Sequence, residues 1–300
     1  TSDETKSLSG ASTQLLRTLD AKTARDNQVT ALLKSPLSQQ AAVQLAVINS
    51  PALQTLLAER WGDLAQAAQS GRIANPILSL ERVRFLDELE FGRILAFGLL
   101  DLLTLPQRNK IATARMKQAE LQLTTDVVGL VSQVRMAWVA SVGAAESLSY
   151  ARQVYASAQA SAELARRMQS VGNFNRLQRA RQQAFYADAA AQLLASKQTA
   201  TSTRESLVRL LGLKDKQAQV LKLPERLPDL PKSYLMPDAV SKVLTTQRLD
   251  VRMAQSQLDA SIETQGLAVI TSLTDIELGL RSDTVKDTHE GTSDKRTGYE

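Results

Sequence analysis

The stretch 170–175, SVGNFN, decides how this chain folds. From Gln107 to Ser170 there is no proline and there are only two glycines, so this span predicts one helix of about 64 residues, roughly 95 Å long. A glycine with a positive φ ends such a helix, and an asparagine after it can cap the next one. Residues 170–175 therefore predict a turn with Gly172 in the left-handed conformation and Asn173 or Asn175 as a cap, after which a second helix runs back.

Both helices carry apolar residues at spacings of three and four, which are typical of coiled coils. In the long helix this seam contains Val127, Val131, Val134, Trp138 and Val142. After the turn the same rhythm continues in smaller residues: Leu177, Ala180, Ala184, Ala187, Ala191 and Leu194. We expect these rows to form the packing seam of a helical hairpin that ends near Gly212. We expect both Trp138 and Trp61 to pack within the protein.

Composition excludes several classes of function. The 300 residues are 43% hydrophobic but only 4% aromatic, which suits alanine-rich helices better than the core of a compact enzyme. Without cysteine and with a single histidine, the chain offers no disulfide, thiol nucleophile or catalytic triad, and we expect no enzymatic activity, metal site or cofactor. The 36 basic residues are scattered among 31 acidic ones, so nucleic acid is not an expected partner. No run of 18 apolar residues is present, and we expect no membrane-spanning helix.

The order of predicted elements divides the chain into four parts. Residues 1–36 form an N-terminal segment, and residues 37–212 form a first repeat. This repeat has a helix to about Ser70 that breaks near Ser50, a β-hairpin at 75–105, and a long helical hairpin at 106–212 that opens at Pro106. A proline-rich connector covers 213–237. Residues 238–300 repeat the order of helix and strand, with a helix at 238–264 and a strand at 269–283, and stop early.

Residues 269–283 alternate between two kinds of side chain. One face contains Thr274, Ile276, Leu278 and Leu280, and the opposite face contains Asp275, Glu277 and Gly279. We expect the apolar face to meet lipid, and Asp275 and Glu277 to line a wet lumen rather than to perform acid–base chemistry. The polar tail predicts a loop that stops where the next strand would begin, so that the chain has three strands.

Six motifs, in this order and spacing, resemble the TolC-like outer-membrane efflux protein family, closest to its metal- and drug-efflux branch. They are AVINSPAL, ANPILSLE, LLDLLTLPQR, RRMQSVGNFNRLQRARQQAFYADA, RESLVRLLGL and ITSLTDIELG, within residues 37–283. The resemblance implies a mainly α fold with a β-barrel portion. A long coiled-coil hairpin and membrane β-hairpins would then form a trimeric duct of two structural repeats. Against that pattern the chain is expected to lack the second strand of the second hairpin and the helical hairpin after it, so it looks truncated and unable to form a working duct alone.

The resemblance also implies a function, a location and partners. The protein would be the outer-membrane channel of a tripartite efflux pump, a passive duct with a helical extension into the Gram-negative periplasm. Its partners would be two further copies of itself, a periplasmic adaptor (membrane fusion) protein, an inner-membrane pump and outer-membrane lipid. The expected adaptor contact is the hairpin tip: Val171, Gly172, Asn173, Phe174 and Asn175. The alternative, drawn from the residues alone, is a non-enzymatic coiled-coil scaffold or interaction protein.

Overall fold

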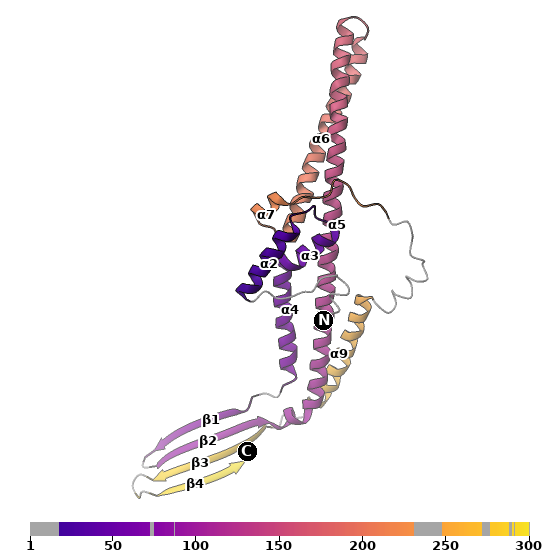
Figure 1. The fold of residues 1–300 in the computed structure, drawn as a ribbon. Helices are drawn as coiled ribbons and strands as arrows, with labels where there is room; N and C mark the ends of the chain where they lie inside the picture. The colour runs from indigo at the N-terminus through magenta and orange to yellow at the C-terminus, as the bar shows by residue number, and fades with distance from the viewer. Residues whose placement is uncertain are drawn as a thin grey trace. The chain divides into compact units, whose positions relative to one another are not determined.

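The computed structural model describes residues 18–72, 75–86, 88–230, 248–271, 277–287, 290 and 292–299. The chain divides into two compact units, one formed by residues 1–59 and 123–240 and the other by residues 60–122 and 241–300 (Figure 1). The helices are α2 (Leu19–Leu32), α3 (Gln39–Asn49), α4 (Pro51–Ser70), α5 (Leu99–Ser170), α6 (Arg176–Leu211), α7 (Asp215–Val220) and α9 (Leu249–Thr271). The strands are β1 (Ile77–Phe85), β2 (Glu88–Gly98), β3 (Glu277–Asp287) and β4 (Ser293–Tyr299).

The first predicted helix is present and breaks where proline requires it. Ser38 caps α3, since its hydroxyl accepts a hydrogen bond from the backbone N–H of Ala41 at 3.2 Å. Ser50 is extended, and α4 begins at Pro51, the helical position where a missing N–H costs nothing. The axes of α3 and α4 differ by 54° across this break, which confirms the predicted kink.

The long helix α5 has 72 residues and begins at Leu99, seven residues before the predicted start at Pro106. The hairpin prediction over 75–105 was therefore too long, because residues 99–105 are helical rather than extended. Leucine is a strong helix former, and a short apolar run fits a buried helix as well as a strand. Pro106 lies inside the helix, where its ring removes one N–H donor.

The seam predicted for α6 is on the wrong side of the helix. Leu177 and Leu194 are 60% and 67% exposed, and the alanines of the same row are exposed too. The buried or half-buried positions lie on the opposite side: Tyr186, Ala189, Leu193, Ser196, Ala200, Thr203 and Leu207. Both rows have heptad spacing, so periodicity could not choose between them. In α5 the predicted residues Val127, Val131, Val134, Trp138 and Val142 are all buried, as expected.

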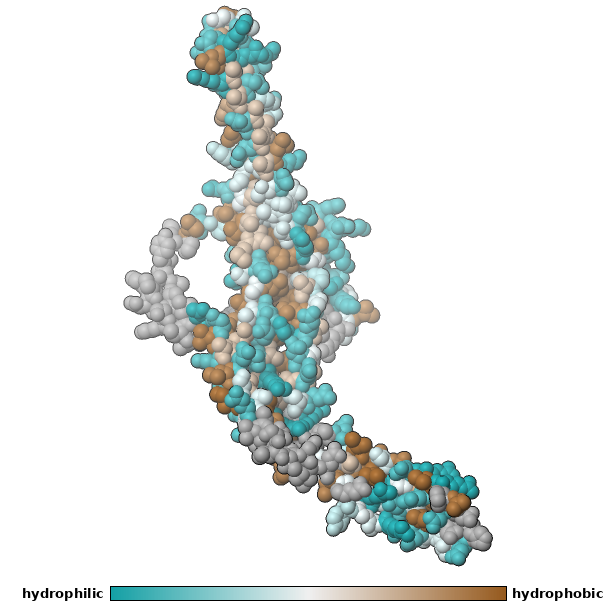
Figure 2. Space-filling model, turned by 180° about the vertical axis from the view of Figure 1, so that it is seen from behind, coloured by the Kyte–Doolittle hydropathy of each residue, from teal (hydrophilic) through white to brown (hydrophobic). Residues whose placement is uncertain are grey.

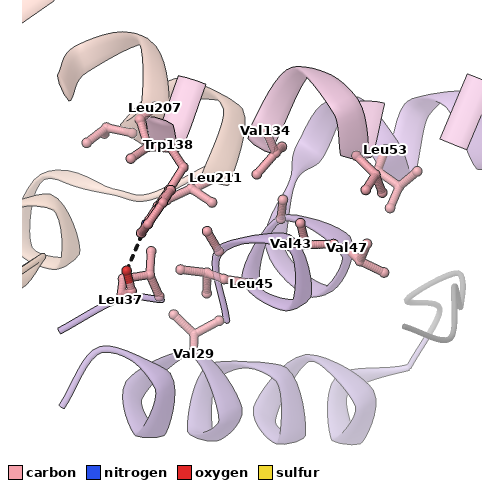
Figure 3. Packing of buried hydrophobic residues seen from close by; sticks show 14 of the residues in the cluster. Val29, Leu37, Val43, Leu45, Val47, Leu53, Val134, Trp138, Leu207 and Leu211 are labelled. Carbon is pink, nitrogen blue, oxygen red and sulfur yellow. Dashed lines mark hydrogen bonds between the residues drawn. The ribbon is translucent and has the colours of Figure 1, made fainter. Parts of the chain in front are cut away.

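The core of the first unit includes Trp138, which Figure 3 shows beside Leu37, Leu207 and Leu211. Val29 of α2, Leu45 of α3 and Leu211 of α6 pack into the same cluster. The indole N–H of Trp138 donates to the carbonyl of Leu37 at 2.8 Å, and the N–H of Leu37 in turn donates to the carbonyl of Lys222 at 2.8 Å. Trp138 is therefore a packing residue, as predicted, whereas Trp61 is 56% exposed and the packing expectation for it was wrong.

The C-terminal end of α6 lies against the break between α3 and α4. Gly212 ends α6 with φ +64°, as predicted. The side-chain amide of Asn49 donates to the carbonyls of Leu211 and Gly212 at 2.9 and 2.8 Å, which satisfies two acceptors that a helix end leaves open. The α3–α4 pair and α6 thus meet at this junction, and residues from all three helices pack with α5 in the same buried cluster.

The sheet in the second unit has four antiparallel strands in the order β1-β2-β3-β4. The expectation of three strands was wrong, because β4 pairs with β3 from Leu280↔Tyr299 to Lys286↔Ser293. Its sequence, SDKRTGY, has no apolar alternation, so pattern analysis assigned it to a loop. Backbone hydrogen bonds with β3 define it instead. The strand predicted at 269–283 is also shifted, since α9 continues to Thr271 and β3 begins at Glu277.

Two further expectations concern the helices. The end of the helix expected at 238–264 was placed too early, since α9 continues to Thr271. The first ten residues of that expected helix lie outside the described chain, and so do residues 231–237 of the connector. We expected no membrane-spanning helix, and by length and composition alone residues 103–170 of α5 are long and apolar enough to cross a membrane. Core helices of soluble proteins pass the same test, and the α5 seam residues are buried against other helices.

Candidate functional site: the hairpin tip and the sheet faces

The tip of the hairpin is a Schellman motif built on Gly172. The N–H of Asn173 donates to the carbonyl of Met168 at 2.9 Å, and the N–H of Gly172 donates to the carbonyl of Gln169 at 3.1 Å. Gly172 has φ +83°, a conformation that favours glycine. The chain therefore leaves α5 with its last carbonyls satisfied and its turn fixed, as the sequence predicted.

Asn175, rather than Asn173, caps the returning helix. Its side-chain oxygen accepts from the N–H of Gln178 at 2.8 Å, and the side chain of Gln178 accepts from the N–H of Asn175 at 2.9 Å. This reciprocal pair is a capping box. Four residues of the tip are exposed and Phe174 is half-buried, so the turn is rigid in its backbone and open to a partner in its side chains.

Arginines surround the tip. Glu163 accepts hydrogen bonds from Arg166 and from Arg167, each at 2.8 Å, and these contacts lower the pKa of the Glu163 carboxyl to about 2. Across the hairpin, the guanidinium of Arg179 donates to the side-chain oxygen of Gln169 at 2.8 Å. This bridge was not predicted from the sequence, in which only the number of arginines near the turn points to it.

A second bridge joins the two helices farther along the hairpin. The rings of Tyr155 and Tyr186 have centroids 5.4 Å apart, and their hydroxyls are 3.0 Å apart. The hydrogen bond to Tyr186 raises the pKa of Tyr155. Together with the Arg179–Gln169 contact, this pair fixes the register of α5 against α6.

One face of the sheet, here called the acidic face, contains Glu81, Gly92 and Asp283 in cross-strand register. A Cβ on Gly92 would lie 3.3 Å from the Cβ of Glu81 and 3.4 Å from Oδ1 of Asp283, so the two carboxylate residues flank the glycine on this face. The guanidinium of Arg281 donates to Oδ2 of Asp283 at 2.7 Å and lies 3.8 Å from Glu90. Asp283 is only 9% exposed, and its Oδ1 has no hydrogen-bond partner among the described residues.

The residues predicted to line a lumen are only partly within the described chain. Asp275 lies outside it. Glu277 is the first residue of β3, and its backbone pairs in register with Gly98, but its side chain is not described. The acidic groups that the structure does define on this face of the sheet were not singled out from the sequence: Glu81, Glu88, Glu90, Asp283 and Asp294. Their alternation is visible in ERVRF and ELEFG only once the register is known.

The opposite face of the sheet, here called the apolar face, carries one row of large hydrophobic residues that crosses all four strands. Leu78, Leu95, Leu280 and Tyr299 are consecutive partners in register. Their exposed fractions run from 38% to 84%. Figure 2 shows hydrophobic and hydrophilic patches side by side over the strands. An uncovered row of this kind indicates a surface that meets lipid or another chain.

Among the described residues there is no group of three or more His, Asp or Glu side chains that could hold a metal ion. What the arrangement offers is a rigid, exposed tip, a helix face of small residues, and a sheet whose two faces differ in polarity.

Comparisons with known proteins agree with this arrangement. Residues 91–213 match the family described as outer membrane efflux protein. One similar solved structure is a membrane protein from Pseudomonas aeruginosa, with a TM-score of 0.66 and 20% sequence identity. The match covers 91% of this chain and 66% of that protein. The Campylobacter jejuni CmeC outer membrane channel has a TM-score of 0.66 and 16% identity, with 96% of this chain and 64% of that chain covered. The outer membrane protein VceC from Vibrio cholerae has a TM-score of 0.66 and 15% identity, and the match covers 91% of this chain and 67% of VceC.

At these identities the likeness shows the fold, and the chain spans about two thirds of the length of these structures. The mainly helical fold with a small sheet is thus confirmed. No curated protein matches the sequence.

Proposed function

We propose that this chain, whose residues 91–213 match the outer membrane efflux protein family, is the outer-membrane channel component of a tripartite efflux pump. It acts as a passive duct that carries small molecules or metal ions from the periplasm to the exterior. The observation that carries this proposal is the combination of the family match over the helical hairpin with a four-stranded sheet that has one exposed apolar row and one acidic face. The sheet favours the channel over a coiled-coil scaffold, because a scaffold built from helices does not require a sheet with one apolar and one acidic face.

The exposed row of α6 supports a trimer. Leu177, Ala180, Ala184, Ala187, Ala191 and Leu194 form an apolar heptad row that faces away from α5. Small residues at heptad spacing let another helix approach closely. In a trimer a helix of the neighbouring copy covers this row, and four strands from each of three protomers close a barrel without free edges.

The two faces of the sheet support a membrane location with helices in the periplasm. Strands of 9 and 11 residues, as in β1 and β2, have the length of tilted membrane strands. In this proposal the apolar face meets lipid and the acidic face lines the wet lumen, and Glu277 and Asp275 keep the lumen-lining role expected from the sequence. Under the same proposal, residues 37–212 and residues 238–300 are two structural repeats, each with a helix followed by strands.

The tip supports the adaptor contact. Val171, Gly172, Asn173, Phe174 and Asn175 form a backbone-fixed turn in which every residue except the half-buried Phe174 is exposed, which suits a preformed contact for the periplasmic adaptor. The adaptor connects the duct to an inner-membrane pump that supplies the energy for transport. The protein itself therefore needs no catalytic residue or cofactor.

Crosslinking in cells tests this proposal. The chain has no cysteine, so Asn173→Cys introduces a unique thiol at the tip. We expect it to crosslink to the adaptor, and the protein to fractionate with the outer membrane and to require detergent for extraction. Gln192→Cys, on an exposed position of α6 about four turns away, is the control and should not react with the adaptor. A protein that stays soluble and gives no adaptor adduct from Asn173 would favour the scaffold instead.

A further inference from the structure

Charge is segregated between the two faces of the sheet. On the apolar face the described side chains include five bases and no acid: Arg82, Arg84, Arg93, Lys286 and Lys295. On the acidic face they include five acids and two bases: Glu81, Glu88, Glu90, Asp283, Asp294, Arg281 and Arg296. The apolar face therefore carries a net positive charge as well as its hydrophobic row.

The five bases, here called the basic band, occupy one end of this face. In register, the row Leu78, Leu95, Leu280 and Tyr299 comes first. The next positions toward the strand turns hold Arg93, then Arg82 level with Lys295, then Arg84 level with Lys286. The basic band thus lies between the hydrophobic row and the β1–β2 and β3–β4 turns.

The side chains of the basic band are available to a ligand. All five are exposed, and within the described chain none forms an ion pair with an acid. The guanidinium of Arg82 lies 5.5 Å from the ring centroid of Phe91, close enough for a cation–π contact that holds its stem along the apolar surface. A cation held in this way at the edge of a hydrophobic row presents its charge at the border between apolar and aqueous surroundings.

We propose that the basic band binds the phosphate groups of anionic lipid in the outer leaflet. The inference rests on the proposed membrane location, in which the strand turns reach the exterior side. Lipid is the occupant that fits both parts of the face, because acyl chains cover the hydrophobic row while phosphates meet the adjacent bases. Arginine binds phosphate through two parallel hydrogen bonds, and three of the five bases are arginines. An acidic soluble protein would match the charges but would leave the hydrophobic row uncovered.

The test uses the full chain in neutral detergent micelles titrated with diphosphoryl lipid A, with bound lipid counted by native mass spectrometry. Lys295→Gln and Arg296→Gln form a matched pair, since these residues are neighbours on β4, both exposed, and lie on opposite faces. Each base near an anionic surface contributes a ~5-fold gain in affinity. Lys295→Gln should therefore weaken binding ~5-fold, the triple variant R82Q/R93Q/K295Q roughly 100-fold, and Arg296→Gln hardly at all.

Two further arms identify the ligand. Lipid A stripped of its phosphates should bind as weakly as it does to the triple variant, and inorganic phosphate alone should not compete. Equal losses for Lys295→Gln and Arg296→Gln, or undiminished binding of the stripped lipid, would overturn the proposal. Insertion into vesicles of neutral phosphatidylcholine separates the two claims. Insertion without phosphate-dependent binding defeats only the lipid inference, whereas failure to insert defeats the membrane location and the inference with it.

Discussion

Two left-handed glycines in the hairpin should respond very differently to the same substitution. Gly172 and Gly212 both end helices with positive φ, at +83° and +64°. A Cβ on Gly172 would meet no atom within 4 Å, whereas a Cβ on Gly212 would lie 2.5 Å from Cδ of Pro51 and 2.7 Å from the carbonyl oxygen of Asn49. Those atoms belong to a proline ring and to the backbone, so they cannot rotate away.

The magnitudes follow from these surroundings. The left-handed conformation costs an alanine about 1–2 kcal/mol, which is the whole expected effect of Gly172→Ala. Gly212→Ala adds overpacking of about 1–3 kcal/mol, for a total of about 2–5 kcal/mol, and disturbs the hydrogen bonds from Asn49. The free energy of unfolding of the first unit should therefore fall clearly more for Gly212→Ala.

Urea unfolding monitored by Trp138 fluorescence measures this difference. Trp61→Phe in all variants leaves Trp138, which lies in the same core as the junction, as the only tryptophan. The m-value should stay constant while the midpoint shifts. If Gly172→Ala destabilised the unit as much as Gly212→Ala, the close contact between the end of α6 and the α3–α4 break would not exist as described.

Three further predictions concern single contacts. Asn175→Ala should lower the stability of the first unit by about 1 kcal/mol because it removes the cap of α6, whereas Asn173→Ala should have little effect; equal effects in thermal unfolding would contradict the assignment of the cap. Trp138→Phe should cost about 1–3 kcal/mol in urea unfolding followed by circular dichroism, since the buried carbonyl of Leu37 loses its donor, and a neutral result would show that this hydrogen bond is unimportant. The pKa of the Glu163 carboxyl, followed by NMR, should be about 2 rather than its ordinary 4.5. Because the folded pKa is lowered, the ion pairs of Glu163 contribute to stability at pH above 4.5, and this contribution is lost as the pH falls through about 2. A titration midpoint near 4.5 would mean that Arg166 and Arg167 do not hold the carboxyl.

Local chemistry made the helical hairpin predictable. Helix-forming residues without proline from 107 to 170 defined most of α5, and Gly172 followed by a capping asparagine defined the turn, because each acts on the backbone within a few residues. The β1–β2 hairpin was predicted for the same reason, although leucine-rich residues 99–105 fit helix and strand equally well. Element type was therefore accessible from sequence wherever neighbours in the chain decide it.

Long-range pairing decided the features that were missed. β4 has no apolar alternation, and only its hydrogen bonds to β3 make it a strand. The two heptad rows of α6 are equally regular, and only contact with α5 shows which one is buried. The acidic face likewise needs the register that brings Glu81 and Asp283 to either side of Gly92. Of the expected site residues, the tip could be located from sequence, but the defined acids of the sheet could not.

The facing of β3 tests the proposed duct most directly. Leu280 and Arg281 are neighbours on opposite faces of this strand, and the chain has no native cysteine. Spin labels attached to Leu280→Cys and Arg281→Cys, in the full chain reconstituted into lipid vesicles, can be compared for collisions with oxygen and with a water-soluble nickel chelate. The account predicts that the label at residue 280 collides mainly with oxygen, dissolved in lipid, and the label at 281 mainly with the chelate in water. Equal accessibility of both labels to the chelate would contradict a sheet that separates lipid from a lumen.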